Sequence, residues 1–394
     1  MLAMKNIGKI LLISIFLIIL PVPMMAAEES NTETPSVMED TLAEIDFSLL
    51  EEYKHNLDSE LSHYLDSKSV KEWLTDFRQG TWEFDIKEIS ENIIKYFFKE
   101  VTANSGLLGK LLILSVVAAL INNLQTSFAS GIARISYLAC FLALSAIAVT
   151  SFKVVLSIGQ HTIDNMVSFM MGMLPQMLML VAALGNINSA AILFPLLMTT
   201  ATAFANAVKN IVFPLIILSA ILSIANQMSS TVKVERMTKF FGQMAQLSLG
   251  LFLTIFVGMI TLRSLYASAL DKVALRTTKF ITDNTIPVVG KMFSDTIEVA
   301  AGYIVMIKQA LGIFGVIIIL GMLIFPLLKI AAIALIYKVT AAVAEPMGDA
   351  KTSAILETLG SHLMLMLAAV ASAGMMFFVM ITVVVAMTSH YGMP

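Results

Sequence analysis

The side chains that could carry chemistry are few and scattered. His161 and Asp164 are three residues apart in an expected loop at the edge of an apolar segment, and one histidine with one carboxylate is weak evidence for a metal site. The chain has five histidines and one cysteine, Cys140. It lacks the zinc-helix, nucleophile-elbow and phosphate-loop patterns of common enzymes. We therefore predict no catalytic residue, no metal, no cofactor and no enzymatic activity.

Other ionisable residues fall within or near apolar segments, and Lys308 and Lys338 lie deepest in them. An ionisable residue inside a membrane is a functional candidate by default. Snorkelling to the membrane surface or a structural ion pair is the competing interpretation for both lysines. No carboxylate lies mid-segment with a second one near it in sequence, which argues against a proton- or sodium-coupled transporter.

The amino-acid composition indicates which class of protein holds these residues. Of 394 residues, 58% are hydrophobic and 13% are charged, whereas soluble domains carry about 25% charged residues. The net charge of −3 conceals an asymmetry: residues 28–100 contain 19 acidic and 7 basic residues, and residues 101–394 contain 9 and 16. The pattern predicts an acidic headpiece followed by a mildly basic membrane domain.

The first 27 residues are typical of a signal peptide. Lys5 and Lys9 precede an apolar run over 10–20, and small residues follow at Ala26 and Ala27. Met25 is larger than usual for the position before cleavage, so an uncleaved anchor is the alternative. Both interpretations place residues 28 onward outside the cytoplasm.

Residues 28–104 are predicted to form a small, acidic, helical extracytoplasmic region. Within it, apolar residues over 86–101 recur at helical spacing among charges, which predicts an amphipathic helix. This helix either packs on the protein itself or lies on a membrane or a partner.

Residues 105–394 are predicted to form a polytopic helical membrane domain. A crossing needs about 20 apolar residues, and we expect seven to nine transmembrane or re-entrant helices. The pairs 189–207 with 211–228 and 303–325 with 327–345 have almost no residues between them, which predicts either tight hairpins or re-entrant elements that do not cross fully. The candidate segments are 107–124, 132–152, 166–184, 189–207, 211–228, 246–267, 303–325, 327–345 and 362–388.

The placement of basic residues orients these segments. With the headpiece outside, residues 229–245 fall inside, and they carry Lys233, Arg236 and Lys239 against Glu235 alone. This stretch resembles a basic interfacial helix, although anchoring of the topology is its simpler role. Residues 268–300 fall outside and the carboxyl terminus falls inside.

A Phe-Pro pair followed by two aliphatic residues occurs three times, around Pro195, Pro214 and Pro326. A proline removes one helical hydrogen bond and either kinks a helix or starts one. Broken helices often line transport sites in membranes. A first-turn position in a new helix is the alternative, and it suits Pro195 and Pro214.

The segment 277–295 interrupts the apolar sequence with charges, Pro287 and Gly290. The helix that starts at 246 is expected to continue beyond the membrane through Arg276 and Lys279. It should break at 284–291, and a new helix should begin near Asp295, which with Glu298 forms an approximate capping box. We predict a helix–break–helix corner that meets a partner or lines a path.

This region, with the sequence LRTTKFITDNTIPVVGKMFSDT, resembles the signature of the stage III sporulation protein AE family of endospore-forming bacteria. Stretches such as MVSFMMGMLPQMLMLVA, FPLIILSAILSIAN and FPLLKIAAIALIYKVTAAVAEPMG agree in order and spacing, and the resemblance covers essentially the whole chain.

The resemblance implies a multi-pass subunit of a transenvelope complex, similar in parts to secretion systems, in the mother-cell membrane around the forespore. The implied partners are other proteins of the same operon, including an ATPase-like and ring-forming components, and a forespore membrane protein met through the complex. No nucleic acid is implied. A stand-alone permease and a purely structural scaffold remain the alternatives.

Overall fold

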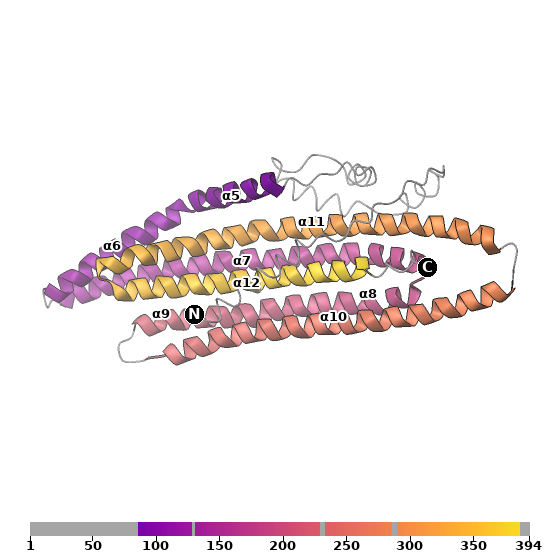
Figure 1. The fold of residues 1–394 in the computed structure, drawn as a ribbon. Coiled ribbons are helices and arrows are strands. Elements are labelled where there is room, and N and C mark those ends of the chain that lie inside the picture. Colours follow the sequence, from indigo (N-terminus) through magenta and orange to yellow (C-terminus); the bar gives the residue numbers. More distant parts are fainter. Residues whose placement is uncertain (1–85, 128–130, 229–232, 286–289, 387–394) are drawn as a thin grey trace. The chain divides into compact units, whose positions relative to one another are not determined.

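The computed structural model describes residues 86–127, 131–228, 233–285 and 290–386 (Figure 1). The chain divides into two compact units, Met1–Glu44 and Ile45–Pro394, and every described residue belongs to the second. All described elements are helical, which confirms the predicted all-α class for this part of the chain. The predicted signal peptide and most of the predicted headpiece lie outside the described residues.

The described residues form eight α-helices, with a π-helical turn between two of them and a 3₁₀ turn between two others. They are α5 (Ile86–Ala103), α6 (Ser105–Ser127), α7 (Gly131–Ala183), α8 (Ile187–Ala207), the π turn η1 (Val208–Val212), α9 (Phe213–Met228), α10 (Glu235–Thr285), α11 (Gly290–Ala344), the 3₁₀ turn η2 (Glu345–Met347) and α12 (Ala350–Ala386).

Six described stretches are long and apolar enough to cross a membrane, fewer than the seven to nine predicted. Both pairs expected as tight hairpins or re-entrant elements are continuous helical stretches, so that expectation is wrong, and a third pair of predicted segments is also joined into one helix. Segments 132–152 and 166–184 both lie in α7, and 303–325 and 327–345 both lie in α11. Segments 189–207 and 211–228 are joined through η1 into a stretch of 41 residues.

Three prolines lie inside these helices without ending them. Pro195 lies well inside α8, and Pro326 lies inside α11. Pro175, which was not predicted as a helix break, lies inside α7. The first-turn interpretation of Pro195 is therefore wrong. A break would expose several backbone polar groups to an apolar medium, whereas a proline leaves about one carbonyl unpaired, so the helix continues.

At Pro214 the chain instead inserts the π turn. The missing amide of Pro214 cannot pair with the carbonyl four residues earlier, and the neighbouring Phe213 N–H donates to the Val208 carbonyl, five residues back. The helix axis thus passes the proline at the cost of one wide turn, and α8 and α9 continue as one stretch.

Helix α12 lies at the centre of the packing and contacts α11, α7, α9 and α10. Of its apolar window 56% is buried, against 22% for α10 and for α6. Glycines permit the closest approach: a Cβ on Gly312 of α11 would lie 2.2 Å from Val385 Cγ2 of α12. Helices α6 and α10 therefore present most of their surface outward.

The predicted amphipathic helix is present as α5, and it packs on α11. The ring of Tyr96 is buried against Phe325, with centroids 4.7 Å apart in an edge-on arrangement. The interpretation in which this helix packs on the protein is thus confirmed for that face. Ile94 and Phe98 remain exposed.

The corner between α10 and α11 falls in the predicted place. Helix α10 ends at Thr285 and α11 begins at Gly290. The new helix begins earlier than the predicted start near Asp295. Residues 286–289, including Pro287, lie outside the described residues.

Candidate functional site

One exposed stripe runs along α7 and changes character twice. At its amino-terminal end the exposed side chains are apolar, as at Ile135 and Val149, and at the other end Met171 and Met179 are again apolar and exposed. Between them the stripe is polar. We use the name polar band for these polar side chains of α7 together with Lys209 of η1. The members on α7 are Lys153, Ser157, His161, Asp164 and Ser168. All members are exposed except Lys209, which is half-buried.

The stripe is too long for one bilayer. Ile135 and Met179 are 71% and 70% exposed, and the 44 residue steps between them span about 66 Å of helix. The hydrocarbon is about 30 Å thick, and even a tilt of about 40° leaves about 50 Å along the membrane normal. Lipid tails therefore cannot cover both apolar ends of α7 at once.

Two placements in the membrane remain, and each leaves part of the stripe uncovered by lipid. If the bilayer is centred on α7, the polar band lies in hydrocarbon, where charges are costly unless they meet water or protein. If the bilayer covers one apolar end, the other end is exposed apolar surface, which marks an interaction site. In both placements the stripe requires protein or a water-filled space beside it.

An ion pair joins the polar band to the π turn. Lys209 Nζ lies 2.5 Å from Asp164 Oδ1, and the two side chains are 22% and 52% exposed. Single π turns inside α-helices frequently occur at functional sites. His161 and Asp164 were expected at the edge of a loop between two segments, and this is wrong because both lie in the middle of α7.

At the level of the polar band, the buried side of α7 packs closely against α9 and α12. Gly159 is buried, and a Cβ on it would lie 3.0 Å from Phe213 Cζ and 3.1 Å from Val370 Cγ2. The polar band is therefore held against a tightly packed interior on its inner side and is open on its outer side.

A second polar cluster fastens three helices in the interior. Ser219 of α9 is fully buried, its hydroxyl donates to the Thr238 carbonyl of α10 at 2.7 Å, and its Oγ lies 2.7 Å from His362 Nε2 of α12. The His362 Nδ1 lies 2.7 Å from the Thr358 carbonyl in its own helix. Sequence spacing gave no signal for this cluster, because its members are far apart in the chain.

A third cluster fixes the turn between α11 and α12. Gly348 has φ of 87°, a left-handed conformation that favours glycine. Asp349 is buried and accepts hydrogen bonds from the Thr352 amide at 3.2 Å, the Thr352 hydroxyl and the Tyr137 hydroxyl at 3.1 Å. Asn123 Nδ2 donates to the Met347 carbonyl at 3.3 Å. Helices α6 and α7 thus hold this turn in place.

The two deep lysines differ in environment. Lys338 lies 3.4 Å from Glu357 of α12, which confirms a structural ion pair for that residue. Lys308 has no exposed surface, so it does not snorkel.

The predicted corner residues come from both sides of the break. Arg276 and Lys279 lie in the last third of α10, and Gly290 and Asp295 lie in the first turns of α11. Their side chains, and all of Pro287, lie outside the described residues, so their predicted roles stay predictions. In the part of the chain that the structure describes, no three histidine, cysteine, aspartate or glutamate residues gather to hold a metal.

Comparison with known proteins assigns the chain to a family. The family model described as stage III sporulation protein AE matches residues 68–388. The stage III sporulation protein AE of Bacillus subtilis (strain 168) is 33% identical over 359 residues, which cover 91% of this chain and 90% of that protein. No solved structure matches the chain. The resemblance found in the sequence is thereby confirmed, and the chain belongs to the stage III sporulation protein AE family.

Proposed function

We propose that the chain is a non-enzymatic membrane subunit of a sporulation-specific, channel-like or secretion-like complex that crosses the envelope between mother cell and forespore. Family membership supports the link to sporulation, and the six long apolar helical stretches support a multi-pass membrane protein. The proposed site of action is the mother-cell membrane around the forespore, where the complex supports forespore development after engulfment.

In this proposal the chain has the three parts that were predicted from the sequence. Residues 1–27 are a signal peptide, residues 28–104 an extracytoplasmic region and residues 105–394 the membrane domain. The extracytoplasmic region faces the space between the two membranes, where it meets other components. The proposed partners are the other membrane, ring-forming and ATPase-like proteins of the same operon.

The observation that carries the proposal of a complex is the α7 stripe. Its two exposed apolar ends lie about 66 Å apart along one helix, with charged residues between them. A protein that works alone in a bilayer gains nothing from such a surface, whereas a subunit buries it against neighbours. The polar band then faces a water-filled path within the assembly.

Deletion of the gene in the native host tests this function. Vegetative growth and sporulation are scored side by side, with a reporter for late forespore gene expression. We expect normal growth with arrest after engulfment, restored by a second copy of the gene. A growth or nutrient defect with normal spores would contradict the proposal.

The corner is tested in the same strain. Pro287→Ala with Gly290→Ala should lower the yield of spores more than Thr34→Ala with Ser36→Ala, since Thr34 and Ser36 lie in the polar stretch after the leader. Equal yields from the two double variants would remove the corner from the functional part of the protein.

A stand-alone permease is the second candidate, and the ion pair beside the π turn favours it, because charged residues within membrane segments often mark substrate or ion pathways. Uptake of small solutes by the purified chain in liposomes separates the two. A subunit of a complex should transport nothing alone. A scaffold without a path would differ from both, since it would tolerate apolar substitutions throughout the polar band.

A further inference from the structure

The residues at and just before the start of α10 combine basic and exposed apolar side chains. Lys233, Arg236 and Lys239 are all exposed, and Phe240 is 55% exposed beside them. Glu235 is the single acidic residue between 233 and 247, and it pairs with Lys239 at 2.5 Å. Among the described residues no ion pair is recorded for Arg236. Residues 229–245 were predicted to resemble a basic interfacial helix, and residues 235–245 form the first turns of α10.

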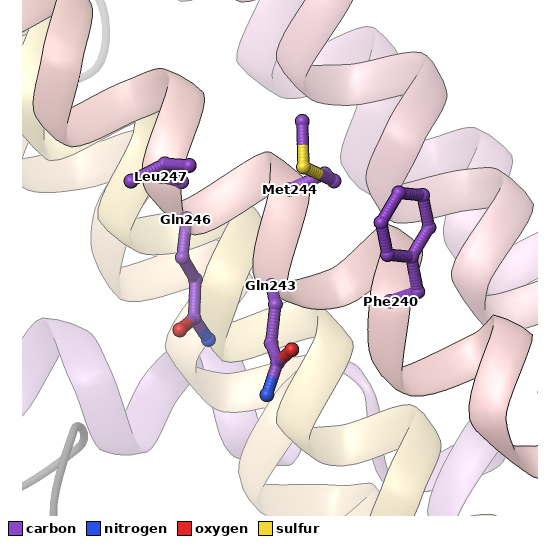
Figure 2. A pocket seen from close by; sticks show the side chains of 5 residues that line it. All are labelled: Phe240, Gln243, Met244, Gln246 and Leu247. Carbon is purple, nitrogen blue, oxygen red and sulfur yellow. The ribbon is translucent and has the colours of Figure 1, made fainter.

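A shallow open groove of about 490 Å³ follows immediately along the same helix (Figure 2). Its apolar side is formed by Phe240, Met244 and Leu247, which are four and three residues apart and so share one side of the helix. The amide groups of Gln243 and Gln246 extend together away from Met244 in Figure 2. The groove thus has an apolar side and a side with hydrogen-bond donors.

The cations stand at one end of this groove. Arg236 precedes Phe240 by four residues, and Lys239 precedes Gln243 by four, so each lies one turn before a groove residue on its own side of the helix. The net charge over 233–247 is +2. An occupant that carries a negative charge at one end and an apolar body behind it would match both features.

The position of α10 relative to a membrane supports the same occupant. The exposed apolar side chains Leu251 and Ile255 continue beyond the groove. Lys239 and Arg263 are 24 residues apart, about 36 Å along the helix, which is slightly more than the hydrocarbon thickness of about 30 Å. Lys239 therefore lies at the level of the lipid headgroups, and the groove enters the hydrocarbon from there.

We propose that the groove binds an anionic glycerophospholipid. The lipid phosphate meets Arg236, whose planar guanidinium suits two phosphate oxygens, together with Lys233 and Lys239. The Gln243 and Gln246 amides donate to the ester carbonyls below the phosphate. One acyl chain lies along Phe240, Met244 and Leu247. This site is independent of the proposed role in sporulation.

The test places a tryptophan in the groove of the full chain. Phe240→Trp is made after the two native tryptophans are replaced by Trp73→Phe and Trp82→Phe. The protein is reconstituted in vesicles of phosphatidylcholine and phosphatidylglycerol, one of which carries brominated acyl chains that quench tryptophan fluorescence on contact. The quenching gives the relative binding constant of the two lipids at the groove. Ile255→Trp, in the same background, reports on lipid away from the groove.

We expect the Phe240→Trp reporter to prefer phosphatidylglycerol by about 25-fold, roughly fivefold for each of two net basic residues near the anionic headgroup. Arg236→Gln with Lys239→Gln should reduce this preference at least fivefold. The Ile255→Trp reporter should show a ratio near one in both backgrounds, and its normal quenching would show that the charge variant is inserted and folded.

Equal constants for the two lipids at the groove would overturn the proposal, as would a preference that survives the charge substitutions. Absence of quenching by either lipid at the groove would also overturn it, because it would mean that protein covers the groove in the membrane.

Discussion

Removal of one buried hydroxyl, by Ser219→Ala, should loosen three helices at once. The hydroxyl donates to the Thr238 carbonyl and contacts His362 Nε2, each at 2.7 Å. Interhelical hydrogen bonds in membrane proteins contribute about 0.6 to 2 kcal/mol each, and the loss leaves both partners buried without this bond. We therefore expect the free energy of unfolding to fall by about 1–3 kcal/mol. The assay is unfolding of the purified chain in mixed micelles by increasing fractions of sodium dodecyl sulfate, followed by circular dichroism.

Ser372→Ala is the matched control. Ser372 is half-buried on α12 and its hydroxyl donates only to Ala368 of its own helix, at 2.8 Å, a type of bond that adds little to helix stability. The double variant Ser219→Ala with His362→Leu should cost less than the sum of its single changes, because both remove the same contact. Equal costs for Ser219→Ala and Ser372→Ala, or full additivity in the double variant, would refute the reasoning.

Two further predictions use the same unfolding assay. Gly312→Ala places a methyl group 2.2 Å from Val385 Cγ2 and should cost about 1–3 kcal/mol by overpacking, whereas Gly258→Ala on α10 meets nothing within 4 Å and should be neutral or stabilising; equal effects would count against close α11–α12 packing. Asp349→Ala removes the shared acceptor of Thr352 and Tyr137 and should cost about 1–2 kcal/mol, and an unchanged midpoint would show that the turn is held by other contacts.

The helical class and the family were predictable from the sequence, because composition and the order of motifs carry both. The apolar segments were located well, and α10 ends at Thr285 and α11 begins at Gly290, inside the region 284–291 in which a break was predicted. The number of crossings could not be predicted from the sequence, since a proline or a short polar run looks the same whether a helix ends or continues there. Pro195 and Pro326 were taken as possible ends, yet in apolar surroundings the helix continues through them.

The polar contacts could not be found from the sequence for a different reason. Asp164 and Lys209 are 45 residues apart, and Ser219 and His362 are 143 apart. In the sequence each of these residues is a single polar residue within or beside an apolar segment, and nothing indicates its partner. Only the packing of α7 on α8 and of α9 on α12 brings the partners together. His161 and Asp164 were singled out from the sequence and lie in the polar band, but they were expected in a loop and not in the middle of a helix.

The accessibility of the polar band to water in the native membrane tests the central claim most directly. Single cysteines are introduced by Ser157→Cys in the band, and by Val149→Cys and Met171→Cys in the apolar parts of the same stripe, after Cys140→Ser. A water-soluble maleimide is then added to membranes from sporulating cells that hold the whole complex. Thiols react as thiolates, and a thiol ionises only where water reaches it. We expect rapid labelling at position 157 and slow labelling at 149 and 171. Uniform labelling along the stripe, or protection at position 157, would contradict the account.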